Sequence, residues 1–151
     1  MTSSVTKIDS LSPREIDCLI AIETLGQKGW PARTIDIART LRVKPPSAVE
    51  IILRLQSKRL LEKGPGGVRV SPAGHTALNE MHRSHRILET MLANLGLSPD
   101  VACRESKKID RYVSMEVTRA FCNYLGHPSA CPDNMPIEPD PKCCKTIQGE
   151  S

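Results

Sequence analysis

Three cysteines lie close together near the end of this chain, in a segment with little capacity to fold by itself. Cys131, Cys143 and Cys144 share that segment with five prolines between positions 128 and 141, which exclude a regular helix. Thiolates are soft ligands that suit zinc, ferrous iron or an iron–sulfur cluster, and bonds to a metal would fix such a loop in place. The segment therefore predicts a metal site, although its spacing is not that of a zinc ribbon or a ferredoxin. A disordered tail with incidental thiols is the alternative.

The other thiols and two histidines are weaker candidates. Cys18 and Cys122 fall on or beside apolar helical positions, and we interpret both as buried core residues. His82 and His127 are possible extra ligands, but a lone histidine is more often a surface or core residue. No nucleophile, base and oxyanion group converge in a recognisable motif, so an enzyme is not expected.

The environment of the chain limits the chemistry of its six cysteines. We find no run of about 18 apolar residues and no basic segment followed by an apolar core, so neither a membrane span nor a secretory signal is expected. A cytoplasmic protein follows, in which thiols are reduced or bound to metal.

Two helices in the first half could place side chains on DNA. Apolar residues recur at three- and four-residue steps in 34–41, residues 43–46 break the pattern, and a second helix begins at Pro45 or Pro46. The first turn of the second helix is polar, and this is the part of a recognition helix that meets bases and phosphates in the major groove. A small trihelical core without DNA binding is the alternative.

A predicted hairpin follows directly. Residues 60–63 and 68–70 are typical of two short strands, and the glycines of 64–67 predict the turn between them. A hairpin after a recognition helix completes a winged helix and would bring its basic residues to the DNA backbone. The candidate DNA-binding residues are Lys44, Pro46, Ser47, Glu50, Lys63 and Arg69.

Charge is divided unequally between the two halves. Residues 1–75 contain 12 Lys and Arg against 7 Asp and Glu, whereas residues 76–151 contain 9 against 10. The positive charge therefore belongs to the predicted winged helix, which favours binding to double-stranded DNA over a redox or metal-carrier protein that keeps this fold only as a scaffold.

The remaining pattern predicts helices. Ser12-Pro13-Arg14-Glu15 is typical of a capping box, and Ser71-Pro72-Ala73-Gly74 repeats the start signal for a helix that continues to Leu95. Its apolar seam predicts a homodimer interface. Two further helices are expected over 101–113 and 115–125. The fold class is mainly α: a winged helix-turn-helix over 1–72, an all-helical dimerisation and metal-binding domain over 73–127, and an irregular Cys/Pro-rich tail over 128–151.

Together, these motifs resemble the diphtheria toxin repressor and manganese transport regulator family of metal-dependent transcriptional regulators. The resemblance covers residues 12 to about 139 and rests on five motifs. They are Pro46-Ser47, Ser71-Pro72-Ala73-Gly74, His85-Arg86-Ile87-Leu88-Glu89, Cys131-Pro132 and Pro136-Ile137. It implies the shorter, two-domain form and a homodimer that binds palindromic operators when iron or manganese is bound.

The resemblance also implies metal ligands. His85 and Glu89 match the family's ancillary site, whose remaining histidine position falls at Cys103. Asp17 and Asp110 match carboxylate positions of the primary site, but its other ligand positions are occupied by Lys107 and Arg111. Because neither cation has a free lone pair at neutral pH, a conventional primary site is not expected.

Compared with the ligands of the family, this sequence has thus moved from nitrogen and carboxylate ligands towards sulfur. We predict a DNA-binding transcriptional regulator whose operator affinity is controlled by an iron–sulfur cluster on Cys103, Cys131, Cys143 and Cys144, with zinc or ferrous iron on the same residues as the alternative. His85, Glu89, Asp17 and Asp110 are the secondary metal candidates. A conventional repressor that depends on Fe²⁺, Mn²⁺ or Zn²⁺ is the alternative function.

Overall fold

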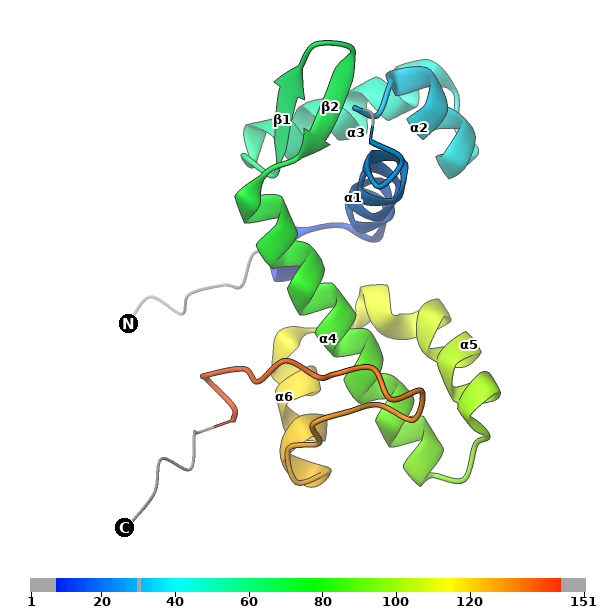
Figure 1. The fold of residues 1–151 in the computed structure, drawn as a ribbon, viewed down its shortest axis with the longest axis vertical. Coiled ribbons are helices and arrows are strands. Elements are labelled where there is room, and N and C mark those ends of the chain that lie inside the picture. Colours follow the sequence, from blue (N-terminus) through cyan, green and yellow to red (C-terminus); the bar gives the residue numbers. More distant parts are fainter. Residues whose placement is uncertain (1–7, 30, 145–151) are drawn as a thin grey trace. The chain divides into compact units, whose positions relative to one another are not determined.

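A computed structural model describes residues 8–29 and 31–144, which form two compact units that divide between residues 79 and 80 (Figure 1). The long helix α4 supplies residues to both. Among the described residues, no helix has the length and apolar character needed to cross a membrane.

The first unit is a winged helix-turn-helix, as predicted. Its elements are a 3-10 turn at Ile8–Ser10, α1 at Pro13–Gly26, α2 at Thr34–Leu41, α3 at Pro45–Ser57, β1 at Leu61–Gly64 and β2 at Gly67–Val70. Leu19, Ile37, Leu55 and Leu60 are almost completely buried and form the centre of its core. Burial of such side chains is the main force that holds the short helices together.

The start of α1 confirms the predicted capping box. The Ser12 hydroxyl accepts from the Glu15 backbone N–H at 3.2 Å, and the Glu15 carboxylate accepts from the Ser12 N–H at 3.0 Å. The same carboxylate pairs with Lys58 at 2.8 Å and Arg54 at 3.6 Å, which ties α1 to α3. Burial alone would raise the pKa of Glu15, but the hydrogen bonds and positive charges of these partners outweigh it and lower the pKa.

The turn between α2 and α3 positions the candidate recognition helix. Arg42 closes α2 in the left-handed conformation at φ 54°, and Lys44 is the extended residue before α3. Pro45 takes the first helical position, where its missing N–H leaves no bond unmade. The helix therefore starts at the first of the two predicted prolines.

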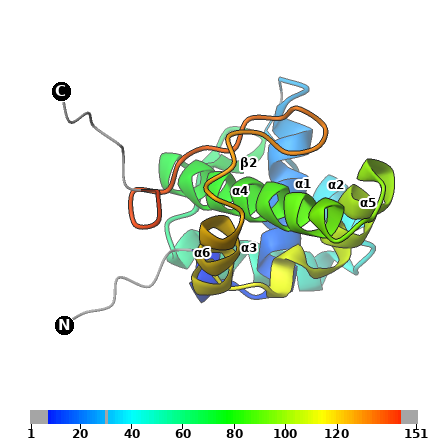
Figure 2. The same ribbon diagram turned by 90° about the horizontal axis from the view of Figure 1, so that it is seen from below.

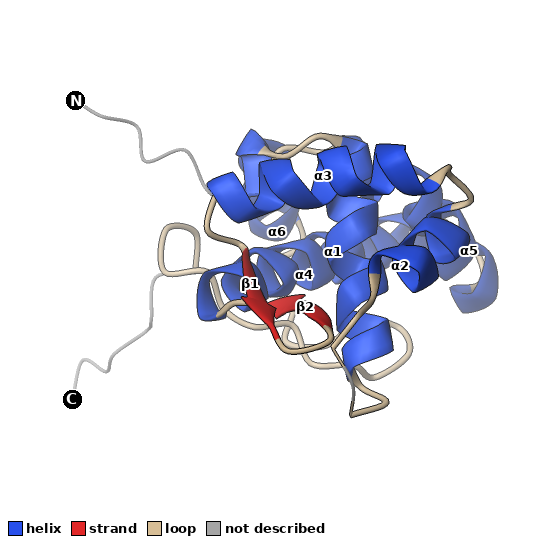
Figure 3. Cartoon of the chain, turned by 90° about the horizontal axis from the view of Figure 1, so that it is seen from above, coloured by secondary structure: helices blue, strands red, loops and turns tan. Residues whose placement is uncertain are grey.

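The wing is an antiparallel hairpin in which Leu61 faces Val70 and Gly64 faces Gly67 (Figure 3). A bridge between Ala32 and Val68 attaches it to the segment before α2. Gly67 is required at this bridge because a Cβ atom there would collide with the Ala32 carbonyl, and because its φ of +154° disfavours other residues.

The helix α4 spans Pro72–Asn94, and its C-terminal part belongs to the second unit. The other elements of this unit are α5 at Pro99–Ile109, a 3-10 turn at Asp110–Tyr112, and α6 at Met115–Tyr124. The prediction of a helix over 101–113 was wrong at both ends. Ser98-Pro99 repeats the start signal of Ser12-Pro13, so α5 begins earlier, and its last residues tighten into the 3-10 turn. The predicted cap at Ser114 is confirmed by its bond to the Val117 N–H.

The described part of the tail is irregular, as predicted, and folds back over α4 and α6 (Figures 1 and 2). Arg83 donates to the Glu138 carbonyl at 2.9 Å, and Arg86 donates to the Pro136 carbonyl at 2.7 Å. A small core joins the tail to the helices. It contains Ile87, Cys122, Cys131, Ile137 and Cys143.

Glu15→Gln should destabilise the chain at neutral pH by about 1–3 kcal/mol, because it removes the charge from a buried acceptor of several hydrogen bonds. The lowered pKa of Glu15 means that its contribution is fully present above the ordinary carboxyl pKa. The contribution is lost as the pH falls through the folded-state pKa. Urea unfolding from pH 7 to pH 3 should therefore show a difference between the two proteins that narrows in acid.

The exposed Glu116 provides the matched control for this experiment. Glu116→Gln should change the unfolding free energy by less than about 0.5 kcal/mol. An equal effect of the two substitutions, or a Glu15→Gln effect that grows in acid, would contradict the role given to Glu15.

Candidate metal centres and nucleic-acid interface

Four potential ligands gather where the tail meets the end of α6. The sulfur atoms of Cys122, Cys143 and Cys144 and a nitrogen of His127 all lie within 4.8 Å of one another, and we call this group the sulfur cluster. Cys122 Sγ lies 3.5 Å from His127 Nδ1 and 3.7 Å from Cys144 Sγ. Cys143 Sγ lies 3.7 Å from the same His127 nitrogen.

The C-terminus of α6 provides the first half of this cluster. The His127 N–H donates to the Cys122 carbonyl, and the Gly126 N–H donates to the Asn123 carbonyl. These two bonds define a Schellman motif, in which Gly126 at φ +73° reverses the chain. The hydrogen bond from the His127 N–H to the last turn of α6 brings the His127 ring back beside Cys122, although four residues separate the two in sequence.

A turn in the tail provides the second half. The Asp140 carbonyl accepts from the N–H groups of both Cys143 and Cys144, and the Asp140 carboxylate accepts from the Lys142 N–H at 2.8 Å. The carboxylate also pairs with Arg119 of α6 at 2.7 Å. Asp140 therefore shapes the turn that carries the two adjacent thiols and also anchors it to α6.

A buried cation lies beside the thiols. Arg83 is only 5% exposed, and its Nη2 donates to Cys122 Sγ at 3.2 Å and to Cys144 Sγ at 3.7 Å. Burial raises the pKa of Cys122 to about 12, and its hydrogen bonds to Cys143 and Cys144 add to the effect. Burial also acts to raise the pKa of Cys144, but bonds from Asp140, Cys122 and Arg83 and the charge of Arg83 lower it overall. Cys144 therefore ionises before Cys122.

A second group contains His85, Glu89 and Cys103, and we call it the mixed cluster. His85 Nε2 lies 3.8 Å from Glu89 Oε2 and 3.8 Å from Cys103 Sγ. His85 and Glu89 stand one turn apart on α4, whereas Cys103 comes from α5. The mixed cluster thus offers one nitrogen, one oxygen and one sulfur ligand.

Asp110 orients the histidine of the mixed cluster. Its Oδ2 lies 3.1 Å from His85 Nδ1, so an N–H at Nδ1 would leave Nε2 as the lone-pair nitrogen that faces Glu89 and Cys103. Its Oδ1 is occupied by Arg111 at 2.8 Å, and Arg111 also donates to the Lys107 carbonyl. Asp110 therefore orients a ligand in this arrangement. Asp17, the other carboxylate candidate, is half-buried on α1 of the first unit.

Glu89 is the least satisfied group of the mixed cluster. Its side chain is 2% exposed, and its Oε1 has no hydrogen-bond partner among the described residues. Burial raises the pKa of Glu89; Cys131 opposes this rise through a hydrogen bond, and Asp133 reinforces it. A buried carboxylate oxygen without a donor fits a bound cation.

The structure divides the four thiols that the sequence analysis assigned to one cofactor. Cys143 and Cys144 join Cys122 and His127, Cys103 joins His85 and Glu89, and Cys131 bonds to Glu89. The reason is the Asp140–Arg119 pair, which directs the tail turn to α6. Cys122, interpreted above as a core thiol, is indeed fully buried but belongs to the sulfur cluster. The spacing Cys-x4-His around Gly126 was the signal that could have revealed it.

Cys18 matches the expectation of a buried thiol. It is 0% exposed, and burial raises its pKa to about 12, with the charges of Asp17 and Glu15 adding to the effect.

The DNA-binding candidates lie on the surface of the first unit. Lys44 precedes α3, and Pro46, Ser47 and Glu50 are exposed in its first two turns. On the wing, Lys63 and Arg69 are exposed, and Arg69 pairs with Glu62 at 3.2 Å. All six candidate side chains are therefore exposed to solvent.

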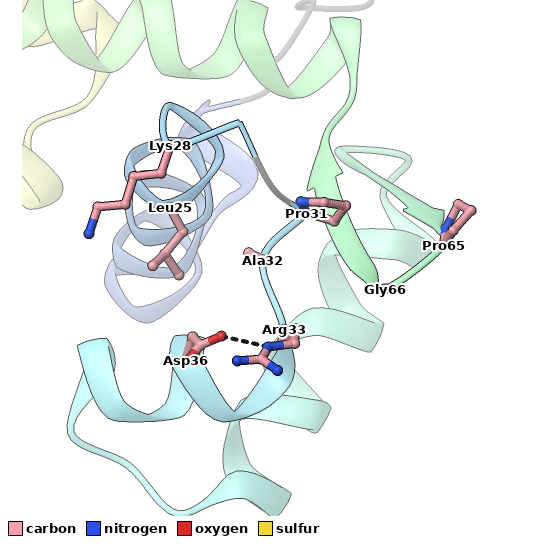
Figure 4. A pocket seen from close by; sticks show the side chains of 8 residues that line it. All are labelled: Leu25, Lys28, Pro31, Ala32, Arg33, Asp36, Pro65 and Gly66. Atoms are coloured by element: carbon pink, nitrogen blue, oxygen red, sulfur yellow. Dashed lines mark hydrogen bonds and ion pairs between the residues drawn. The ribbon is translucent and has the colours of Figure 1, made fainter.

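A hollow of about 500 Å³ in the first unit lies between α1, α2 and the tip of the wing (Figure 4). Its polar side chains Arg33 and Asp36 already bind each other at 3.0 Å, and no cysteine or histidine is among the described residues that line it. Lys28 is its remaining polar residue, and the other lining residues are apolar or glycine, so the hollow offers few converging polar groups for a specific ligand.

Most of the second unit matches a known protein family. A family model described as the metal binding and dimerisation domain of iron dependent repressors matches residues 71–139. The match includes the mixed cluster and ends before Cys143 and Cys144.

Named relatives and solved structures are consistent with this match. Transcriptional regulator MntR of Salmonella typhimurium is 34% identical over 91 residues, which are 60% of this chain and 58% of the relative. The chain thus matches less than two thirds of that relative's length. MntR of Escherichia coli O6:H1 is 34% identical over 106 residues, or 70% of this chain and 68% of the relative.

The hypothetical protein SSo2273 from Sulfolobus solfataricus has a TM-score of 0.76 at 33% identity, over 85% of this chain and 100% of that chain. IdeR of T. acidophilum has a TM-score of 0.63 at 32% identity, over 86% of this chain and 61% of that chain.

Arg83→Gln should release the tail, because it replaces a buried charged side chain with a shorter neutral one. The shorter side chain cannot donate to both the Glu138 carbonyl and the thiols. Hydrogen bonds to charged groups contribute about 1.5–3 kcal/mol, so local opening should increase roughly ten- to one hundred-fold. Endoproteinase Lys-C cleavage after Lys142, followed by mass spectrometry in the presence of EDTA, measures this opening. Arg104→Gln, which changes an exposed arginine beside Glu105, should leave the rate unchanged. Equal rates in all three proteins would show that Arg83 does not hold the tail.

Proposed function

Since the chain belongs to the diphtheria toxin repressor and manganese transport regulator family, we propose that it is a DNA-binding transcriptional repressor controlled by a divalent metal ion. The observation that carries the proposal is the exposed N-terminal end of α3 in a winged helix-turn-helix, where Lys44 precedes the helix and Ser47 and Glu50 lie in its first two turns. The names of the relatives as transcriptional regulators support it. We also propose that it acts in the cytoplasm, where thiols remain reduced.

We propose that α3 enters the major groove and that the wing follows the adjacent backbone. Lys44 would contact a phosphate, Ser47 a phosphate or a base, and Glu50 would accept from a cytosine amino group. Pro45 and Pro46 occupy the first two positions of α3, so Lys44, Ser47 and Glu50 lie together at its N-terminal end. Lys63 and Arg69 would contact phosphates from the wing. A carrier protein has no need of this surface, which favours the regulator over the redox or metal-carrier alternative.

The mixed cluster is the metal site that we assign to regulation. Glu89 has a buried oxygen without a donor, and Asp110 holds His85 so that Nε2 faces the other two ligands. Nitrogen, carboxylate and thiol ligands together suit ferrous iron, manganese or zinc. A bound ion would neutralise the Glu89 carboxylate and connect α4 to α5.

An iron–sulfur cluster on Cys103, Cys131, Cys143 and Cys144 receives no support from this arrangement, because those thiols belong to different groups. We therefore favour the conventional repressor, which binds a single divalent ion in the mixed cluster.

We propose a homodimer whose interface includes α6. Val117 and Tyr124 lie two turns apart on one side of this helix and are 41% and 77% exposed. Tyr112 and Leu95 add exposed apolar area within the same unit. A dimer with two-fold symmetry would match palindromic operators, in which half-sites lie about 34 Å apart.

Replacing Lys44 with Ala should weaken binding to all duplexes and lower the salt slope of log Kd by about one, because one phosphate contact is lost. Ser47→Ala should weaken binding further, without this salt effect if Ser47 contacts a base. Fluorescence anisotropy on a palindromic duplex selected from genomic DNA with the manganese-loaded chain measures both. Lys108→Ala, an exposed lysine of the second unit, is the control. Unchanged affinity in the Lys44→Ala/Ser47→Ala double variant would remove α3 from the interface.

Val117→Glu should convert the dimer to a monomer, since it places a charge in the centre of the proposed apolar interface. Sedimentation velocity at micromolar concentration measures the mass, with Lys108→Glu as a charge-changing control. A wild-type chain that sediments as a monomer, or a variant that remains a dimer, would exclude α6 from the interface.

A further inference from the structure

We propose that Cys122, His127, Cys143 and Cys144 form a closed, four-coordinate site for Zn²⁺ that pins the tail to α6. This site is separate from the mixed cluster that the proposed function uses. It also extends beyond the residues that the family model matches, because Cys143 and Cys144 follow residue 139.

Geometry is the first support. In a tetrahedral zinc site with Zn–S of about 2.3 Å and Zn–N of about 2.0–2.1 Å, neighbouring sulfur atoms lie roughly 3.8 Å apart and a sulfur and a nitrogen roughly 3.6 Å apart. The observed Cys122–Cys144 distance is 3.7 Å, and the two thiol–His127 distances are 3.5 and 3.7 Å. Three of the six ligand–ligand distances therefore match the edges of a zinc-sized tetrahedron, and the other three are no longer than 4.8 Å.

Charge is the second support. Three thiolates and one neutral imidazole around Zn²⁺ carry a net charge of −1, and the three thiol protons pass to solvent when the ion binds. Arg83 is buried against Cys122 and Cys144, and its Nη1 has no partner among the described residues. Asp140, which is also buried nearby, already pairs with Arg119. An anionic zinc–thiolate centre supplies the counter-charge that a buried guanidinium requires.

The surroundings also orient the ligands. The Cys143 thiol lies 3.6 Å from the Arg119 carbonyl and 3.5 Å from Asn123 Oδ1, so it is held against α6. The Schellman motif fixes Cys122 and His127, and the Asp140 turn fixes Cys143 and Cys144. Because protein ligands fill all four positions, no position is open for substrate, and the site is structural.

The experiment measures metal content and spectrum in the full-length chain. The protein is purified anaerobically with a reductant and analysed for zinc, iron and acid-labile sulfide. The metal-free chain is then titrated with Co²⁺, which reports tetrahedral thiolate ligands by its visible d–d bands and its near-ultraviolet sulfur-to-cobalt charge-transfer bands. Competition with Zn²⁺ gives the zinc affinity.

Two variants and two matched controls locate the ion. His127→Ala changes an exposed side chain, so folding should survive, and it should weaken Zn²⁺ binding by more than about tenfold. Cys144→Ser should do the same. His75→Ala, an exposed histidine of the first unit, should have no effect. Cys103→Ser removes the thiol of the mixed cluster and should leave the tetrahedral thiolate spectrum in place.

Three outcomes would overturn the proposal. The first is iron with stoichiometric sulfide, which would indicate an iron–sulfur cluster. The second is a thiolate spectrum that survives both His127→Ala and Cys144→Ser but disappears in Cys103→Ser. The third is a reduced chain that binds no Zn²⁺ or Co²⁺ through thiolates. None of these readouts uses DNA, so failure of the zinc site and failure of the regulator proposal can be distinguished.

Discussion

The second unit depends on how the charge of Arg83 is compensated. A guanidinium that is taken out of water must be paired, because an isolated buried charge costs several kcal/mol (about 3–5 when one partner of a buried pair is lost). Arg83 leaves α4 and reaches the Glu138 carbonyl and two thiols, so one side chain joins the long helix, the tail and α6. The described part of the tail has no helix or extended strand, although backbone hydrogen bonds join 129–131 to 135–137. Its position therefore follows from polar contacts to α4 and α6 together with the small core that it shares with them.

The two clusters differ in the metal chemistry that their ligand types would support. The mixed cluster combines imidazole, carboxylate and a single thiol between α4 and α5, which suits a divalent ion that is exchanged as its supply varies. The sulfur cluster combines three thiols with one imidazole, which suits an ion that is retained. In this account, the mixed cluster supports regulation and the sulfur cluster supports the tail. The separation also explains why cysteines that lie close in sequence, such as Cys131 and Cys143, have different partners.

Local signals in the sequence predicted the helix starts and the wing, because a Ser-Pro cap or a glycine turn acts over a few residues. The same rule would have placed the start of α5 at Ser98-Pro99. Which cysteines and histidines come together was less predictable from the sequence, because this depends on where the irregular tail packs against the helices. The Asp140–Arg119 pair and the Schellman motif at Gly126 decide that Cys143 meets Cys122 and His127 and does not meet Cys103. The helical periodicity predicts that Cys122 is a core residue, and Cys122 is fully buried. A buried thiol can also be a metal ligand, so the two roles are compatible.

The claim that the chain holds two separate metal environments is tested most directly by anomalous diffraction from crystals grown with Zn²⁺ and Mn²⁺. Data collected above and below the zinc absorption edge would locate each zinc ion independently of the protein model. We expect a zinc peak bonded to Cys122, His127, Cys143 and Cys144, and a second metal position beside His85, Glu89 and Cys103. A disulfide in place of the first peak, or one metal centre shared by Cys103, Cys143 and Cys144, would contradict it.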